Sequence, residues 1–562
     1  MKQITIFPPR SHGGAVVYAA DFGFSPAVAD NTEALCRAIA HCRQTGAEKL
    51  CLAPGTYRIK SPDFIILEGF EDFTLDGCGA EIISETSHFF CLQNCNRVRI
   101  TGLTLDFDWN VFRLASLVRV LSREGKELTV EFLNCPAPER CDICSFNRFD
   151  AQRLTPGAED GLEIWVHAEN LSDFRPGPAP NSLHFLCNEP NVERMQPGEI
   201  YLARHLRQRQ GAAFFILDST HITVDRNTVY STLGMTHMVG GHSHHLLFDH
   251  ETIRIRPDSN RYISTDGDGI HIIRSKGHIV IQNCDFSGMG DDSVNIHDCN
   301  LFILKKTASD TVLLENEGVG EPGDLYDLRN PDFSPTGIYP TLKEMRRTAS
   351  GAYELQFTQD LPEWVGEGHM MLCKSYCSDH YILRNNHFHD HRARGLLLQA
   401  SHGLVEQNLF ENIQGAGIFV MLEILRGSWY EGSGAEDLTI RNNTFRNCNC
   451  GTWTSTIDVM AAIPDNTSDH KIFRNITVRD NDITTIKAPA VYFSTCTQLA
   501  FTQNRITFTG GPSAYAPVIT ERSNDCSFTD TTVDGLPLTE DRIQVSNDCS
   551  SRRCMPLYAG LY

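Results

Sequence analysis

Residues 264–297 read STDGDGIHIIRSKGHIVIQNCDFSGMGDDSVNIH and hold short β-type runs among acidic residues. Asp268 and Asp292 stand 24 residues apart in this stretch. Short runs rich in β-branched residues and bounded by glycine or polar turn residues are typical of strands. The same interval recurs along the chain, so this stretch is interpreted as two turns of a repeated unit.

The repeat is clearest in strand-like segments that end in asparagine. The copies read HITVDRN, IVIQN, YILRNN, LVEQN, LTIRNN, ITVRDN and AFTQN, and they end at Asn227, Asn283, Asn386, Asn408, Asn443, Asn481 and Asn504, with His250 of LLFDH in the equivalent place. The intervals 227 to 250, 386 to 408 and 481 to 504 are 23, 22 and 23 residues. This period without a helical pattern indicates a parallel β-solenoid. Each asparagine is expected at a bend, in the left-handed conformation, with its side chain bonded to the asparagine of the next coil.

The predicted fold class is all-β: a right-handed parallel β-helix with an N-terminal capping helix and two inserted small antiparallel β domains. A leucine-rich repeat has a similar period, but it needs the pattern L-x-x-L-x-L, which these copies lack. The capping helix is expected after Asp30 or Asn31 and up to about Gln44, where apolar residues recur at helical spacing. The rhythm stops twice, in segments with alternating strand patterns. The expected domains are 1–106 (cap and first coils), 107–211 (first inserted domain), 212–299 (central coils with the acids), 300–372 (second inserted domain) and 373–562 (last coils and tail).

Composition limits the function classes. The 562 residues carry a formal charge of −21, which argues against nucleic acid and anionic membranes as partners because both demand basic patches. The sequence has no run of 18 apolar residues and no signal-peptide pattern, so a cytoplasmic protein is expected. The 20 cysteines are expected as mostly buried free thiols. Cys141-x-x-Cys144 lacks a second pair at zinc spacing, and the expectation is no metal and no cofactor.

Aligning the coils by their small-then-apolar pattern gives the register of the acids. Ile270, Val294 and Leu396 then share an inward column, and side-chain alternation makes Asp268, Asp292 and Arg394 an outward one. Neighbouring coils are about 4.8 Å apart, so the two carboxylates can share one water or one proton. Two carboxylates this close raise an apparent pKa.

A third acid stands out of this register. Asp291 is displaced sideways from the pair, and a protonated Asp291 facing a water held by Asp268 and Asp292 would satisfy an inverting glycosidase, in which acid and base are about 6.5–9.5 Å apart. Asp266, beside Gly267, is expected in a turn role. Calcium binding by the acids is the competing interpretation.

These motifs resemble known carbohydrate-active β-helices. Thr265-Asp266-Gly267-Asp268 and Gly290-Asp291-Asp292 loosely match the N-T-D and D-D motifs of the polygalacturonases of glycoside hydrolase family 28. The chain lacks that family's G-H-G, and Arg394-Gly395-Leu396 stands where the family has R-I-K. The sequence is more similar to glycoside hydrolase family 110, the α-1,3-galactosidases, in Asp268–His271, Gly288–Asp292, Asn295, His297, Arg394-Gly395, Gln399 and Trp429–Glu431.

The second resemblance implies an exo-acting, metal-independent, inverting α-1,3-galactosidase acting on blood group B type or linear α-galactosyl glycans, and a homodimer is plausible. It implies that Asp291 is the general acid and that Asp268 and Asp292 hold the water. The remaining site residues are expected to bind substrate: His271, Asn295, His297, Arg394, Gln399, Trp429 and Glu431. For Arg394 a salt bridge within the stack is an equal alternative. The alternative functions are a polygalacturonase-like hydrolase, a lyase and a non-catalytic glycan-binding β-helix.

Overall fold

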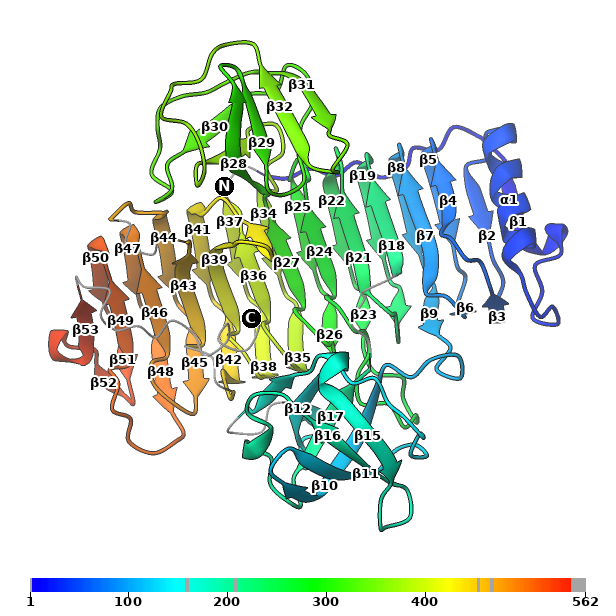
Figure 1. Ribbon diagram of the computed structural model, residues 1–562. Coiled ribbons are helices and arrows are strands. Elements are labelled where there is room, and N and C mark those ends of the chain that lie inside the picture. Colours follow the sequence, from blue (N-terminus) through cyan, green and yellow to red (C-terminus); the bar gives the residue numbers. More distant parts are fainter. Residues whose placement is uncertain (1–2, 157–160, 206–210, 452–454, 465–468, 547–562) are drawn as a thin grey trace.

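The protein is a long β-helix with three parallel sheets as its faces (Figure 1). The computed structural model describes residues 3–156, 161–205, 211–451, 455–464 and 469–546. The predicted all-β, parallel β-helix class is confirmed. Each coil contributes one strand to each sheet, so residues one coil apart lie side by side.

The first sheet contains β1 (Val16–Tyr18), β2 (Lys49–Cys51), β5 (Glu71–Asp76), β8 (Asn96–Thr101), β19 (Thr220–Asp225), β22 (His244–Asp249), β25 (Ile279–Gln282), β34 (Tyr381–Arg384), β37 (Gly403–Glu406), β41 (Ala435–Arg441), β44 (Phe473–Arg479), β47 (Cys496–Thr502) and β50 (Asn524–Thr529). The second sheet contains β3 (Gly55–Ile59), β6 (Ala80–Ser84), β9 (Thr104–Phe107), β20 (Thr228–Val229), β23 (Thr252–Ile253), β26 (Asp285–Ser287), β35 (His387–His391), β38 (Leu409–Ile413), β42 (Thr444–Cys448), β45 (Asp482–Thr485), β48 (Arg505–Phe508), β51 (Thr532–Val533) and β52 (Leu536–Pro537). The third sheet contains β4 (Ile65–Glu68), β7 (His88–Gln93), β18 (Ala212–Leu217), β21 (Met235–Gly240), β24 (Ile270–Ile273), β27 (Val294–His297), β36 (Leu396–Gln399), β39 (Ile418–Leu425), β43 (Ile457–Ala462), β46 (Val491–Ser494), β49 (Val518–Glu521) and β53 (Ile543–Ser546), with β40 (Trp429–Glu431) antiparallel to β39.

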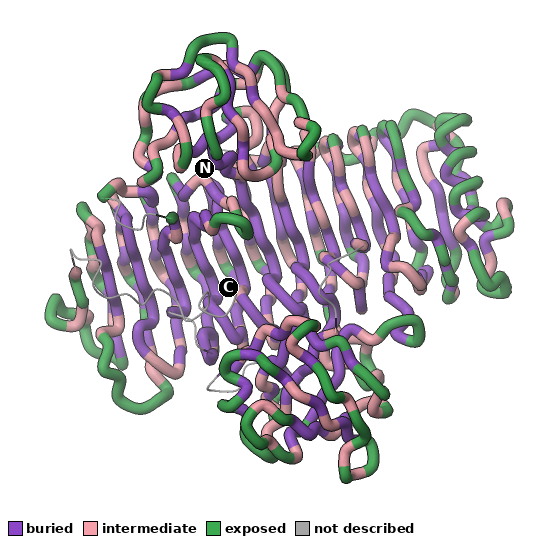
Figure 2. Tube along the Cα trace, viewed as in Figure 1, coloured by how far each residue is buried: buried purple, intermediate pink, exposed green. Residues whose placement is uncertain are grey.

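Apolar columns inside the helix hold the coils in register. Ile270 pairs with Val294 and Val294 with Leu396, and all three are fully buried. The predicted inward column is therefore confirmed. Figure 2 shows buried strands along the whole molecule, with exposed chain mainly at turns and on outer loops. Because strand side chains alternate faces, a fixed inward column also fixes which polar residues face outward.

A buried asparagine ladder runs along one corner, as predicted, but its members differ in part. From Asn386 to Asn481, each ladder asparagine donates two hydrogen bonds, from its backbone amide and its side-chain amide, to the side-chain oxygen of the next ladder asparagine. The left-handed residue is the one before the ladder position, as at Asn385 and Asn442, so the expected left-handed conformation of the ladder asparagines themselves was wrong. His250 and Asn283 occupy this preceding position, so placing them in the ladder was wrong, and Glu251 and Cys284 take the ladder places.

The N-terminal helix closes the first end of the core, as predicted. It spans α1 (Thr32–Thr45), with Asn31 as its N-cap residue, and Asp30 accepts a hydrogen bond from the Thr32 amide at 2.9 Å. Leu35, Ala38 and Ile39 on α1 belong to the main hydrophobic core. No helix in the described part of the chain has the length and apolar character needed to cross a membrane.

Two antiparallel sheets interrupt the coils, at opposite ends of the third-sheet strands (Figure 1). The first insertion follows β9 and contains β10 (Ala115–Glu124), β11 (Glu127–Phe132), β12 (Ser145–Asp150), β13 (Thr155–Pro156), β14 (Glu163–Trp165), β15 (Leu171–Pro176), β16 (Ser182–Cys187) and β17 (Ile200–Arg204). The second insertion follows β27 and contains β28 (Asn300–Ala308), β29 (Thr311–Leu314), β30 (Tyr326–Arg329), β31 (Leu342–Arg347), β32 (Tyr353–Phe357) and β33 (Met370–Cys373). Each insertion has its own hydrophobic core. The first insertion stands at the corner where the third-sheet strands begin.

The ladder makes a testable contribution to stability. Asn443 makes four buried hydrogen bonds, two from Asn408 and one each to Val405 and Asn481, all at 3.0 Å. We expect Asn443→Ala to lower the free energy of unfolding by about 2–4 kcal/mol, because buried partners are left unsatisfied. Urea unfolding would measure this. Asn524→Ala, at an exposed position of β50, is the control and should change stability by less than about 0.5 kcal/mol; an equal loss in both variants would contradict the prediction.

Candidate active site

An outward column of charged residues lies just before the third-sheet strands β24, β27 and β36. Arg394 donates from Nε and Nη2 to the two oxygens of Asp292, at 2.7 and 2.8 Å. The backbone amide of Asp292 in turn donates to Oδ1 of Asp268 at 3.2 Å. The predicted column is therefore present. Of the two interpretations of Arg394, the structure shows the salt bridge within the stack.

Two histidines continue the hydrogen-bond chain from Asp268. His271 Nδ1 lies 2.6 Å from Asp268 Oδ2, and His271 Nε2 lies 3.1 Å from Nε2 of His297. His297 Nδ1 lies 2.9 Å from the carbonyl of Asp298, which can only accept, so this nitrogen carries the proton. Burial lowers the pKa of His297 to about 3, so the ring is neutral and its Nε2 accepts from His271. His271 Nε2 therefore donates the proton in this contact.

Asp291 stands beside this column and has a different partner. Its Oδ1 accepts a hydrogen bond from Nη1 of Arg392 at 3.2 Å. The same guanidinium donates from Nε and Nη2 to Glu163 of the first insertion, at 2.8 and 2.5 Å. One oxygen of each of Asp268, Asp291 and Asp292 lies within 4.8 Å of the others. The three predicted catalytic carboxylates are thus brought together.

The electrostatics of the cluster favour a bound proton near neutral pH. Burial, with the nearby charges of Asp291 and Asp268, raises the pKa of Asp292 to about 7, although Arg394 opposes the shift. Burial also raises the pKa of Glu431, which is hydrogen-bonded to Asn295 and lies near His271. Carboxylates that interact this strongly titrate as a set, so the proton belongs to the group.

Asp266 has a role that its sequence context does not indicate. It lies in a bend, as predicted, but its side chain is buried and pairs with Arg204 of the first insertion at 2.9 Å. The Arg204 Nη2 also donates to the Asp266 carbonyl at 3.0 Å. A turn role alone is therefore wrong, because the inserted strand β17 reaches back and places a guanidinium over the bend.

The first insertion contributes residues that sequence reasoning missed. Trp165 lies between two arginines, with its ring centroid 5.0 Å from Cζ of Arg392 and 5.9 Å from Cζ of Arg204. Arg392 could have been found by its position two residues before Arg394 in the motif RARG. Trp165, Glu163 and Arg204 carry no such signal, because the docking of the insertion does not follow the coil period.

The remaining predicted substrate residues fall into two groups. Asn295, Gln399 and Glu431 lie near the acids, since Asn295 and His271 pair in register and Gln399 pairs with His297. The side-chain amide of Gln399 is buried, and neither of its polar atoms has a hydrogen-bond partner among the described residues. Trp429 is instead 44% exposed in β40, opposite Leu425. Glu431, at the end of β40, lies near Asn295 and His271, so the hairpin of β39 and β40 reaches the site.

The acid cluster offers a poor donor set for calcium. Ca²⁺ takes six to eight oxygen ligands at about 2.3–2.6 Å. Both oxygens of Asp292 already accept hydrogen bonds from Arg394, and Asp291 Oδ1 accepts one from Arg392. Two guanidinium groups therefore occupy positions where a cation would have to approach.

The fold and the cluster define a right-handed parallel β-helix protein with buried carboxylates on its third sheet. A family model described as "Right handed beta helix region" matches residues 364–475. Over most of its length the chain is similar to curated α-1,3-galactosidases. It is 25% identical to "Alpha-1,3-galactosidase A" of Bacteroides fragilis (strain YCH46), over 87% of each chain. It is 23% identical to "Alpha-1,3-galactosidase B" of Bacteroides thetaiotaomicron, over 79% of this chain and 74% of that one.

The resemblance that the motifs indicate is confirmed by this similarity. Among solved structures, a family 28 exopolygalacturonase from Yersinia enterocolitica superposes with a TM-score of 0.42 at 14% identity, covering 95% of this chain and 78% of that chain.

The buried pair between Asp266 and Arg204 yields a prediction. Arg204→Met should lower the free energy of unfolding by about 3–5 kcal/mol, because it leaves the buried Asp266 carboxylate without its counter-charge. The double variant Arg204→Met/Asp266→Asn should recover part of this loss, since it removes the orphaned charge. Urea unfolding of the three proteins would test both statements.

The same substitution at an exposed pair provides the control. Arg140 and Asp142 pair at 3.9 Å, with side chains 69% and 73% exposed, so Arg140→Met should change stability by about 1 kcal/mol or less. A double variant no more stable than Arg204→Met would show that the buried charge is not the cause.

Proposed function

We propose that this chain is an exo-acting, inverting glycoside hydrolase that releases terminal α-1,3-linked galactose. The observation that carries the proposal is the enclosed cluster of Asp268, Asp291 and Asp292 on adjacent coils. Three carboxylates gathered in this way provide both an acid and a base for glycoside hydrolysis. The similarity to α-1,3-galactosidases over 87% of the chain supports galactose as the released sugar.

In this proposal Asp268 and Asp292 hold and deprotonate the attacking water, and Asp291 protonates the leaving oxygen. The contacts from Asp268 through His271 to His297 support the base role, because they fix the orientation of the Asp268 carboxylate. Arg392 donates a hydrogen bond to the Asp291 carboxylate at 3.2 Å. The acid proton therefore has to come from the coupled set, where burial raises the pKa of Asp292 to about 7.

The assignment of an inverting mechanism is supported by the hydrogen bonds of Asp268 and Asp292, and not by the distance between the acids. Carboxylate oxygens within 4.8 Å are closer than the usual separation of about 6.5–9.5 Å in inverting enzymes. Both oxygens of Asp292 accept hydrogen bonds from Arg394, and both oxygens of Asp268 are also bonded. Carboxylates held in this way are better placed to orient water than to attack an anomeric carbon.

Burial supports action on chain ends. Asp268, Asp291 and Asp292 are 2%, 8% and 1% exposed, which suits a single terminal sugar better than a continuous polysaccharide. The two arginines at the cluster, Arg392 and Arg394, are already paired with acids. A substrate carboxylate would therefore have to displace one of these pairs, which disfavours galacturonate.

The product anomer tests the proposal directly. Incubation with Gal-α-1,3-Gal should release galactose first as the β anomer. Proton NMR, recorded before mutarotation mixes the anomers, would measure this. Initial α anomer would overturn the inverting mechanism, and no release from this disaccharide or from a fucose-branched B trisaccharide would overturn the substrate class.

The division of roles gives a second prediction. Asp291→Asn should lose most activity on Gal-α-1,3-Gal, by about 10²–10⁴-fold in kcat/KM, but much less on an aryl α-galactoside whose leaving group needs no proton. Asp268→Asn should lose activity on both substrates, since both need the activated water. For wild type on the disaccharide, kcat/KM should fall as pH rises through about 7, because the carboxylate set then loses its proton. Equal losses by Asp291→Asn on both substrates would contradict the acid assignment.

A further inference from the structure

A second group of possible metal ligands lies on the outer face of the second sheet. Asp285 on β26 pairs in register with His387 on β35, and His389 on β35 pairs with Glu411 on β38. Phe388, between the histidines, points inward and is fully buried. The four polar side chains therefore form two neighbouring pairs, offset by two residues, on three adjacent strands whose places on the second sheet are visible in Figure 1.

The donor atoms lie close together between the strands. The two imidazoles are stacked with centroids 4.0 Å apart, so one ring has to turn for both nitrogens to reach the same ion. Asp285 Oδ2 lies 3.3 Å from His387 Nδ1 and 3.4 Å from His389 Nε2. One ligand atom from each residue lies within 4.8 Å of the others. Ligands bound to zinc at about 2.0–2.1 Å in a tetrahedron are separated by roughly 3.3–3.4 Å. Two edges of the group already have this length.

The far nitrogen of each imidazole faces an acid that can orient it. His389 Nδ1 lies 2.7 Å from Oδ2 of Asp390, whose Oδ1 accepts a hydrogen bond from Asn412 at 2.9 Å. His387 Nε2 is buried 3.5 Å from Glu411 Oε2, and it has no hydrogen-bond partner among the described residues. Carboxylates behind ligating histidines are the usual outer partners of bound zinc, because they fix the tautomer and the ring orientation.

We propose that Asp285, His387 and His389 form a Zn²⁺ site that ties adjacent coils of the second sheet together. Two imidazoles and a carboxylate suit zinc better than Mg²⁺ or Ca²⁺, which prefer oxygen ligands. The side chains of Asp285, His387 and His389 are 40%, 32% and 20% exposed, so an ion can enter and a water can complete the tetrahedron. This site is separate from the carboxylates of the proposed hydrolase and does not depend on that function.

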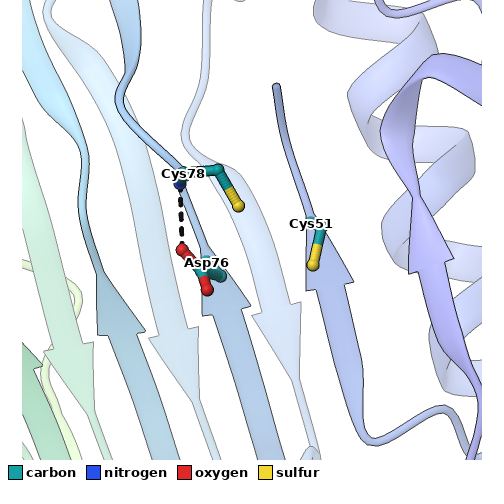
Figure 3. A group of neighbouring side chains, drawn as sticks. All are labelled: Cys51, Asp76 and Cys78. Atoms are coloured by element: carbon teal, nitrogen blue, oxygen red, sulfur yellow. Dashed lines mark hydrogen bonds between the residues drawn. The ribbon is translucent and has the colours of Figure 1, made fainter. Parts of the chain in front are cut away.

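Other groups of possible ligands require controls. Cys51, Asp76 and Cys78 lie together near the start of the helix (Figure 3), where Lys49 already pairs with Asp76 at 2.6 Å. Thiols there could capture zinc, so the host protein for the test is the full chain with Cys51→Ser/Cys78→Ser. Asp379, His380 and His402 form another group, on the first-sheet side, and provide a matched pair of histidines for removal.

The experiment first strips the protein of metal with a chelator and then measures how much zinc it takes up. The host is equilibrated with ZnCl₂ by dialysis, and bound metal is quantified by mass spectrometry. His387→Asn/His389→Asn in this host should lose one equivalent of zinc. His380→Asn/His402→Asn should lose none. Retention of the full amount in the first variant, or an equal loss in both, would overturn the proposal.

A second measurement does not depend on the variants folding. Zinc should raise the Tm of the host by roughly 3 °C or more, EDTA should reverse the rise, and Mg²⁺ or Ca²⁺ at the same concentration should not reproduce it. No zinc-dependent rise in Tm would overturn the proposal, because an ion that links neighbouring coils must stabilise the folded chain.

Discussion

The structure depends on the register between coils. Backbone hydrogen bonds hold neighbouring strands about 4.8 Å apart, and fully buried columns such as Ile270, Val294 and Leu396 prevent slippage. A slip of one residue would turn every apolar side chain outward, so the core fixes the register strongly. The asparagine ladder adds a polar constraint at one corner, where each side chain satisfies buried backbone groups of the preceding coil. Outward side chains are consequently stacked with the same precision as inward ones.

This stacking allows buried charges to be tolerated. Asp292 sits opposite Arg394 of the next coil, with both oxygens hydrogen-bonded, and Asp266 is matched by Arg204 of the first insertion. Removing a charge from water costs several kcal/mol, and a partner with good geometry is needed to offset it. The next coil supplies Arg394 as the partner of Asp292, and the first insertion supplies Arg204 as the partner of Asp266. The first insertion is therefore part of the site, and an apolar seam that includes Trp109, Leu202 and Ile263 holds it against the helix.

Much of this arrangement could be predicted from sequence, because it follows from a period. The coil repeat and inward alternation gave the column of Asp268, Asp292 and Arg394 and the lateral offset of Asp291. The ladder was misplaced by one residue at His250 and Asn283, since Glu251 and Cys284 fill ladder positions without being asparagine. The contacts of Trp165, Glu163 and Arg204 could not be predicted. They depend on how a non-repeating domain docks, and no spacing along the chain encodes that.

Charge balance links the packing of the site to its chemistry. Asp268, Asp291, Asp292 and Glu163 are four carboxylates in contact with one another or with the two guanidiniums of Arg392 and Arg394. The acids exceed the arginines, and the buried surroundings cannot screen the excess as water would. Retaining a proton is the remaining way to lower this energy, which agrees with the raised pKa of Asp292. An enclosed cluster of this composition keeps a proton near neutral pH because its buried surroundings cannot screen the excess negative charge.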